Sequence, residues 1–207
     1  MKYTAPIAIL SGLTAAAPQF GGLGGGSGSS TSNELLQGSC KKVILIFARA
    51  STEAGNMGGS MGPQVCSGLK SALNNDVICQ GVGGPYTAGL MDNVKAEGTT
   101  QEAIGEATRM FTTADTKCPD SIIVFGGFSQ GTAVMHGSVK ALPNNIKEKI
   151  AGGVLFGDTR NAEDNGQVPN FPKDKIKIYC EEDDGVCGQG LSVTGGHFVS
   201  LRKRMIL

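Results

Sequence analysis

The residues of this sequence with the clearest chemical potential are serines that lie between glycines. Ser129 lies in the segment Gly-Phe-Ser-Gln-Gly, which matches the G-x-S-x-G pattern of a serine nucleophile on a sharp strand-to-helix turn. Glycine is needed on both sides because the serine backbone is strained and neighbouring elements come too close for side chains. A serine at such a turn faces unpaired backbone N–H groups at a helix N-terminus, which suits covalent catalysis.

A second serine, Ser60, also lies in a G-x-S-x-G segment, so the pattern alone does not identify the nucleophile. The context of the two serines differs. Ser129 follows the apolar run Ile122–Phe125, which is typical of a buried strand, and precedes the small-residue segment Gln130–Leu142, which is typical of a helix. Ser60 follows no strand pattern. We therefore predict Ser129 as the nucleophile.

A serine nucleophile needs a base, and the sequence contains two histidines. His136 lies seven residues along the helix that begins beside Ser129, which places it roughly 10 Å away along the helix axis. We expect His136 to be a partly exposed helix residue that cannot reach the serine. His197 lies in a glycine-containing loop after the last predicted strand and is the predicted base.

The base needs a carboxylate to hold its tautomer and to stabilise the imidazolium. The chain order nucleophile, acid, base predicts that this carboxylate lies between Ser129 and His197. The candidates lie in the short loop that a Cys180–Cys187 disulfide would close, and position alone does not choose among Glu181, Glu182, Asp183 and Asp184.

The elements that must position these residues alternate between strands and helices. Helices are predicted after Pro63, after a capping box at Thr99–Glu102, and over Gln130–Leu142. The predicted strands are Lys42–Ala48, Asp76–Val82, Ile122–Phe125, Ala151–Phe156 and Lys175–Cys180. This alternation predicts an α/β protein with a parallel sheet, helices on both faces and a site at the carboxyl ends of the strands.

The length and charge narrow the class of protein. The chain has 207 residues, which suits one domain, and it carries 18 basic and 18 acidic residues. A balanced charge does not favour a nucleic-acid or anionic-membrane surface. Six cysteines without a C-x-x-C pattern favour disulfides in an oxidising compartment over a zinc ribbon or a thioredoxin-type site, and their pairing stays open.

The N-terminal part is expected to lie outside the folded domain. Residues 1–17 resemble a signal peptide, with Lys2 before a mostly apolar stretch that is too short to span a membrane, and with cleavage beside Ala16 or Ala17. Residues 18–33 are rich in glycine and serine and are predicted to form a flexible leader. The folded domain is predicted over residues 34–207.

Several segments taken together resemble the cutinase family of secreted esterases. They are Lys42–Glu53, Gln80–Gly84, Lys117–Asp120, Gly127–Gly131 and Cys180–Cys187, and the similarity covers about Cys40–His197. The resemblance implies a three-layer α/β-hydrolase fold with a mainly parallel five-stranded sheet, helices on both faces and no lid. The family's D-x-V-C arrangement matches Asp184–Cys187, which makes Asp184 the catalytic acid by resemblance, with His197 as the base.

The resemblance also implies the roles of residues around the nucleophile. The hydroxyl of Ser51 and the backbone N–H of Gln130 would form the oxyanion hole, and Asn93 would steady Ser51. The implied disulfides are Cys40–Cys118, Cys66–Cys79 and Cys180–Cys187. Apolar residues that flank the open cleft of the family match Leu90, Leu191, Val193 and Phe198.

The sequence departs from the family pattern at several places. Phe128 replaces a tyrosine, Asp183 replaces a glycine beside the acid, and Gly196 replaces a proline before the histidine. The family continues into a final helix, whereas this sequence ends ten residues after His197, so the C-terminal helix is expected to be truncated.

The resemblance implies a secreted, monomeric serine esterase that hydrolyses cutin, a hydroxy-fatty-acid polyester, or short-chain esters. It implies no metal or organic cofactor, no nucleic-acid partner and no stable membrane insertion. An acetylxylan esterase and a catalytically impaired secreted homologue are the alternatives.

Overall fold

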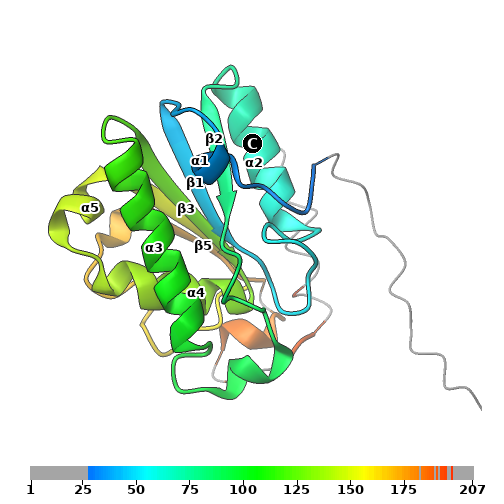
Figure 1. Ribbon diagram of the computed structural model, residues 1–207. Coiled ribbons are helices and arrows are strands. Elements are labelled where there is room, and N and C mark those ends of the chain that lie inside the picture. The colour runs from blue at the N-terminus through cyan, green and yellow to red at the C-terminus, as the bar shows by residue number, and fades with distance from the viewer. Residues whose placement is uncertain (1–27, 182, 189, 191, 195–196, 198–207) are drawn as a thin grey trace, which may run out of the picture.

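The computed structural model describes residues 28–181, 183–188, 190, 192–194 and 197. Its centre is one sheet in which every neighbouring pair of strands runs parallel, in the order β2-β1-β3-β4-β5 (Figure 1). The strands are β1 (Val43–Ala48), β2 (Val77–Gly81), β3 (Ile122–Phe128), β4 (Ile150–Phe156) and β5 (Ile176–Tyr179). The predicted α/β class and five-stranded parallel sheet are confirmed.

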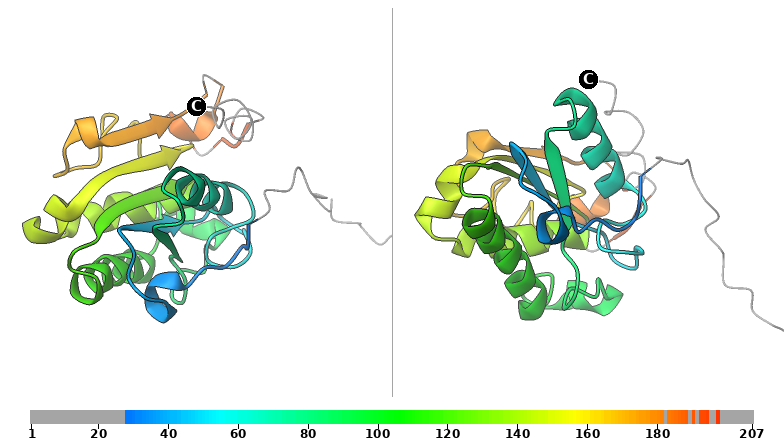
Figure 2. Two further views of the ribbon diagram at one scale, coloured as in Figure 1. Left: turned by 90° about the horizontal axis from the view of Figure 1, so that it is seen from above. Right: turned by 45° about the horizontal axis from the view of Figure 1, so that its top comes forward.

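Helices cover both faces of this sheet, as predicted (Figure 2). On one face lie α1 (Glu34–Gln37), α3 (Gln101–Lys117), α4 (Gln130–Ala141) and α5 (Asn144–Lys149), and on the other lies α2 (Met61–Ala72). Side chains alternate along a strand, so Ile44 and Ile46 of β1 join the first core while Leu45 and Phe47 join the second. Two-sided burial explains the continuous apolar sequence of β1.

Three short 3₁₀ helices complete the described part of the chain: η1 (Leu90–Val94), η2 (Lys173–Lys175) and η3 (Gly185–Cys187). Neither η1 nor α5 was predicted from the sequence. The helix cap before α3 differs by one residue from the expected capping box. Thr100, not Thr99, is the N-cap, because its side chain accepts the N–H of Ala103 at 3.0 Å.

The segment before α1 belongs to the fold. The expected flexible leader ran to Asn33, yet Ser32 donates its hydroxyl to the carbonyl of Cys79, and Asn33 forms a bridge with Gln80. The carbonyl of Ser30 accepts the N–H of Met57 at 2.9 Å. The last residues of the expected leader therefore pack on the domain. The segment expected to be a signal peptide, residues 1–17, lies outside the described residues.

Because parallel strands end at one edge, the loops after β1, β3, β4 and β5 meet there. These four loops carry Ser51, Ser129, Gly157 and Asp184 respectively. Within the part of the chain that the structure describes, no helix combines the length and apolarity needed to cross a membrane.

Two helix glycines provide a matched test of the packing. A Cβ at Gly105 of α3 would meet no atom within 4 Å, whereas one at Gly137 of α4 would lie 2.5 Å from Cδ1 of Ile104. Gly105→Ala is expected to raise the free energy of unfolding by up to about 1 kcal/mol, through lower backbone entropy of the unfolded chain. Gly137→Ala is expected to lower it by about 1 kcal/mol or more, through overpacking.

Urea unfolding of both variants with the disulfides intact measures this difference. Equal stabilisation by the two substitutions would show that α3 and α4 do not pack as closely as described.

Candidate active site

Ser129 occupies a strained turn between β3 and α4, with φ 52° and ψ −123°. The two motif glycines are required by close contacts. A Cβ at Gly131 would lie 2.1 Å from the carbonyl oxygen of Ala48, and one at Gly127 would lie 2.7 Å from the carbonyl oxygen of Gly131. The backbone geometry predicted for a nucleophile turn is therefore present at Ser129.

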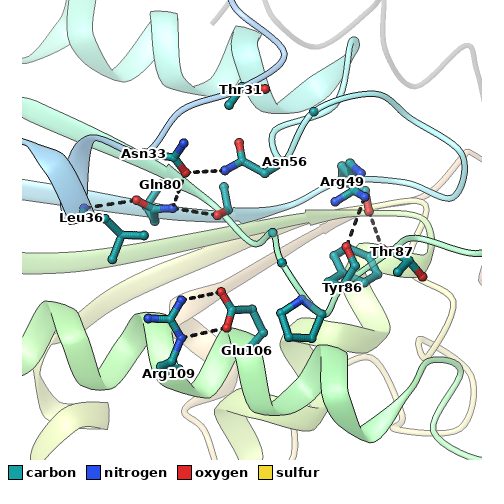
Figure 3. A pocket seen from close by; sticks show the side chains of 15 residues that line it. Thr31, Asn33, Leu36, Arg49, Asn56, Gln80, Tyr86, Thr87, Glu106 and Arg109 are labelled. Atoms are coloured by element: carbon teal, nitrogen blue, oxygen red, sulfur yellow. Dashed lines mark hydrogen bonds and ion pairs between the residues drawn. The ribbon is translucent and has the colours of Figure 1, made fainter.

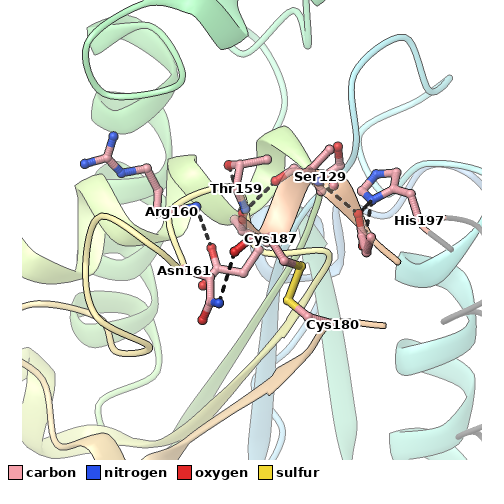
Figure 4. The surroundings of a disulfide bond; sticks show 12 residues. Ser129, Thr159, Arg160, Asn161, Cys180, Cys187 and His197 are labelled. Carbon is pink, nitrogen blue, oxygen red and sulfur yellow. Dashed lines mark hydrogen bonds and ion pairs between the residues drawn. A yellow bond between two sulfur atoms is a disulfide. The ribbon is translucent and has the colours of Figure 1, made fainter. Parts of the chain in front are cut away.

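A buried imidazole–carboxylate pair lies beside this turn (Figure 4). Nδ1 of His197 lies 3.0 Å from both carboxylate oxygens of Asp184, and the two residues are only 3% and 4% exposed. Asp184 also accepts the N–H of Val186 at 3.2 Å, which fixes the carboxylate at the start of η3. Among the candidate acids that the structure describes, the carboxylate of Asp184 reaches His197. Asp183 is exposed, and Glu182 lies outside the described residues.

Two further residues, which sequence reasoning did not assign to the site, hold the imidazole. The ring of Phe128 stacks on His197, with centroids 5.1 Å apart and planes at 23°. Gly157 has φ 54°, and a Cβ there would lie 2.5 Å from Cε1 of His197 and 3.2 Å from Oδ2 of Asp184. The sequence signal for Gly157 was its place directly after a predicted strand, at the edge where sites form.

The predicted oxyanion-hole residues converge on the same place. Nδ2 of Asn93 donates to Oγ of Ser51 at 2.9 Å and to the carbonyl oxygen of Leu90 at 2.8 Å. Because the Ser51 hydroxyl accepts from Asn93, its own hydrogen can donate to a further oxygen. Gln130 is the first residue of α4, so its backbone N–H has no partner within the helix. Its buried side chain donates to the carbonyl oxygen of Gly89 at 2.7 Å, which ties α4 to the start of η1.

Ser51, Asn93, Ser129 and His197 line one cavity of about 600 Å³. Its rim carries four large apolar side chains that are 56–74% exposed, namely Leu90, Met91, Val94 and Val193. Two of these, Leu90 and Val193, were predicted to contact substrate. Leu191 and Phe198, the other two predicted contacts, lie outside the described residues. The remaining lining residues are Ala50, Ser51, Thr52, Glu53, Ser60, Asn93, Phe128, Ser129, Thr159, Val186 and His197.

Ser60 also borders this cavity, but its environment differs from that of Ser129. It is the N-cap of α2 with φ −113°, and its hydroxyl donates to the carboxylate of Glu53. The second carboxylate oxygen of Glu53 accepts the N–H of Ala50 at 2.9 Å. Ser60 therefore helps to hold the loop after β1 and lacks the strained backbone of a nucleophile turn.

A second cavity of about 470 Å³ shares no lining residue with the first (Figure 3). Its polar side chains pair largely with one another: Nδ2 of Asn56 donates to Oδ1 of Asn33 at 2.8 Å, and Arg109 forms two bonds of 2.8 Å with Glu106.

His136 was expected to be partly exposed, and this expectation is wrong. It is 2% exposed because the loop after β4 covers this part of α4. Its ring nitrogens face two carboxylates, with Nδ1 lying 2.7 Å from Oδ2 of Asp164 and Nε2 lying 3.1 Å from Oδ2 of Asp158.

The three disulfides implied by the resemblance are present. They join Cys40 to Cys118, Cys66 to Cys79, and Cys180 to Cys187. The last one links the end of β5 to η3 and so closes the loop that carries Asp184.

Comparison with known proteins agrees with this arrangement. "Probable cutinase 1" of Aspergillus niger is 53% identical over 173 residues, which cover 83% of this chain and 66% of that protein. "Probable cutinase 3" of Neosartorya fischeri is 50% identical over 196 residues, which cover 94% of this chain and 88% of that protein.

Among solved structures, Trichoderma reesei cutinase in complex with a phosphonate inhibitor matches with a TM-score of 0.73 at 29% identity, covering 84% of this chain and 74% of that one. An acetylxylan esterase matches with a TM-score of 0.62 at 19% identity, covering 77% of this chain and 90% of that one, and so shares the fold. The cutinase family model matches residues 39–204. This chain therefore belongs to the cutinase family of carboxylic ester hydrolases.

Proposed function

We propose that this protein is a secreted serine esterase that hydrolyses cutin and short-chain esters through Ser129, His197 and Asp184. One observation carries the proposal: Ser129, on its strained turn, lines the same cavity as His197, which is bonded to a buried carboxylate. The phosphonate complex of the related T. reesei cutinase supports it, since phosphonates are reagents for activated serines.

The first half of the reaction forms an acyl-enzyme. The Asp184 carboxylate accepts Nδ1–H of His197, which leaves Nε2 as the base. As Oγ of Ser129 attacks the ester carbonyl, its proton passes to Nε2. The hydroxyl of Ser51 and the N–H of Gln130 donate to the oxygen on which negative charge develops. Collapse of the tetrahedral intermediate expels the alcohol, which takes the proton from His197.

The second half of the reaction regenerates the serine. Water enters the open cavity and attacks the acyl carbonyl while His197 takes one of its protons. The carboxylic acid leaves as Oγ of Ser129 recovers the proton. These steps use the named side chains, the backbone N–H of Gln130 and water.

The apolar rim favours a substrate with a hydrocarbon part. Exposed side chains of this size around one cavity mark a binding surface, and Leu90, Met91 and Val94 all come from η1 beside the oxyanion hole. A polyester chain can lie across such a rim with its carbonyl at Ser129. Three disulfides and the predicted signal peptide support secretion.

Replacing each candidate nucleophile tests the central proposal. Ser129→Ala is expected to lower kcat for p-nitrophenyl butyrate by roughly 10⁴-fold or more, the scale on which removal of a catalytic serine acts. It should also abolish covalent labelling by a phosphonate probe. Ser60→Ala, the matched control from the other G-x-S-x-G segment, should retain labelling and most of kcat.

Labelling of the Ser129→Ala protein, or equal losses in both folded variants, would refute the assignment. A wild-type protein that fails to react with the probe would instead identify an impaired homologue.

Gly157→Ala tests the placement of the base. The added Cβ would displace His197 or Asp184, so kcat is expected to fall about 100-fold, the size of effect that a misplacement of about 1 Å produces. Gly68→Ala is the control, since a Cβ there meets no atom within 4 Å. Kinetics on both variants, with circular dichroism to confirm the fold, measure the difference. Unchanged kcat in Gly157→Ala would place the working base elsewhere.

The substrate class is tested by relative rates. We expect p-nitrophenyl butyrate and cutin to be hydrolysed faster, per mole of ester, than acetylated xylan, because the apolar rim binds hydrocarbon rather than sugar. Chromatography that monitors the release of hydroxy fatty acids and of acetate over time gives these rates. Faster release of acetate from xylan would favour the acetylxylan esterase alternative.

A further inference from the structure

His136 lies in a cluster that the proposed reaction does not use. Its imidazole is buried on α4, Asp158 is fully buried, and the side chain of Asp164 is 17% exposed. The two aspartates lie in the loop that follows β4, here called the clamp loop and defined as residues 157–164. His136 thus contacts this loop at two points, one near its start and one at its end.

The clamp loop also touches the active site at several places. Gly157 packs against the imidazole of His197. The N–H of Thr159 donates to Oγ1 of Thr132 at 3.0 Å, and that hydroxyl donates to the carbonyl oxygen of Ser129 at 2.6 Å. Farther along the loop, as Figure 4 shows, the side chain of Asn161 donates to the carbonyl oxygen of Cys187 at 3.2 Å. One loop therefore connects the nucleophile turn, the base and the acid loop.

We propose that His136 is a positioning residue which, bonded to Asp158 and Asp164, holds the clamp loop on α4 and thereby keeps His197 and Asp184 aligned with Ser129. This inference rests on the proposed function of that triad. It assigns His136 no contact with substrate.

The geometry of the cluster favours a protonated imidazole. A neutral imidazole has one N–H, so one of the two facing carboxylates would meet a nitrogen lone pair. Leaving the fully buried carboxylate of Asp158 without this donor would cost stability. With both nitrogens protonated, His136 donates to both aspartates. Both nitrogens are then engaged, which leaves neither to bind a metal.

The surrounding charges favour this form. Burial lowers the pKa of His136, but the hydrogen bonds and charges of Asp158 and Asp164 outweigh it and raise that pKa above its ordinary value. For Asp164 the directions are reversed. Burial raises the pKa of this carboxyl, but its hydrogen bond to His136 and the charges of His136 and Arg160 outweigh burial and lower the pKa below its ordinary value.

Of the other charged groups near this part of α4, Arg160 contacts the same two aspartates and Lys140 pairs elsewhere. Nε of Arg160 lies 3.6 Å from Oδ2 of Asp164, and the N–H of Arg160 donates to Oδ1 of Asp158 at 3.0 Å. On the next turn of α4, Lys140 pairs with Glu97 of the loop before α3 at 2.6 Å. Arg160 belongs to the clamp loop itself, so of these cations it is His136 that links the loop to α4.

The sign of the pH dependence follows from the raised pKa. Stabilisation by His136 is fully present below the unfolded-state pKa of about 6.5 and is lost as the pH rises through the higher pKa of the folded state. The contribution of the clamp to catalysis should fade over the same range.

The test compares H136Q with K140Q, which removes another cation from the same helix but leaves the clamp loop untouched. At pH 6.5, at a temperature where all variants are folded, kcat of H136Q for p-nitrophenyl butyrate should be about tenfold below wild type, with KM within about twofold. The ratio of wild-type to H136Q kcat should approach one as the pH rises to 9. K140Q should match wild type within about twofold throughout.

A ratio of one at every pH, or a loss that stays constant with pH, would overturn the proposal, since a merely structural role has no reason to follow this titration. If H136Q does not fold, D164N serves instead, because it removes one of the two clamp contacts. It should show a smaller kcat loss with the same pH trend, and a pH-independent kcat ratio would again refute the clamp.

Hydrogen exchange separates failure of this inference from failure of the triad. Amides of the clamp loop should exchange at least about tenfold faster in H136Q than in wild type at pH 6.5, and unchanged exchange would refute the clamp. This readout does not depend on esterase activity. An active Ser129→Ala protein would therefore refute the triad and leave the clamp testable.

Discussion

The crowded backbone around Ser129 is the constraint on which the rest of the site depends. The end of β1 approaches the first turn of α4 so closely that no side chain fits at Gly131. Ser129 itself is held in a conformation that costs about 1–3 kcal/mol for a residue with a side chain. Two backbone bonds offset this cost, from the N–H of Ser129 to Phe156 at 3.0 Å and from Thr132 to the carbonyl oxygen of Ser129 at 2.8 Å. The nucleophile turn thus relies on both β4 and α4.

Once this turn is in place, parallel pairing brings the other groups to it. The loop after β1 supplies Ser51, the loop after β4 supplies Gly157, and the loop after β5 supplies Asp184. β5 is an edge strand of the described sheet, so its loop has a neighbouring strand on one side alone. The Cys180–Cys187 disulfide closes this loop. The buried bond between Asp184 and His197 then joins this outermost loop to the centre of the site.

His136 shows why distance along a helix is an incomplete guide to the role of a residue. Its seven-residue separation from Ser129 argues against it as the base, and its ring bonds to Asp158 and Asp164 instead. The same separation places it two turns along the helix face, under the clamp loop. A buried imidazole between two carboxylates couples that helix to the loop that packs against His197.

The sequence by itself determined the alternation of strands and helices, the strand-to-helix turn at Ser129 rather than at Ser60, and the residues that match the cutinase pattern. These follow from local signals, because apolar runs, glycines and helix caps act within a few residues. What only the tertiary structure decided lies between segments distant in the chain. The exclusion of a side chain at Gly157, the stacking of Phe128 on His197, the burial of His136, and the packing of residues 30–33 all depend on partners from other elements. No local pattern encodes such contacts, since they arise when the parallel strands bring their loops to one edge.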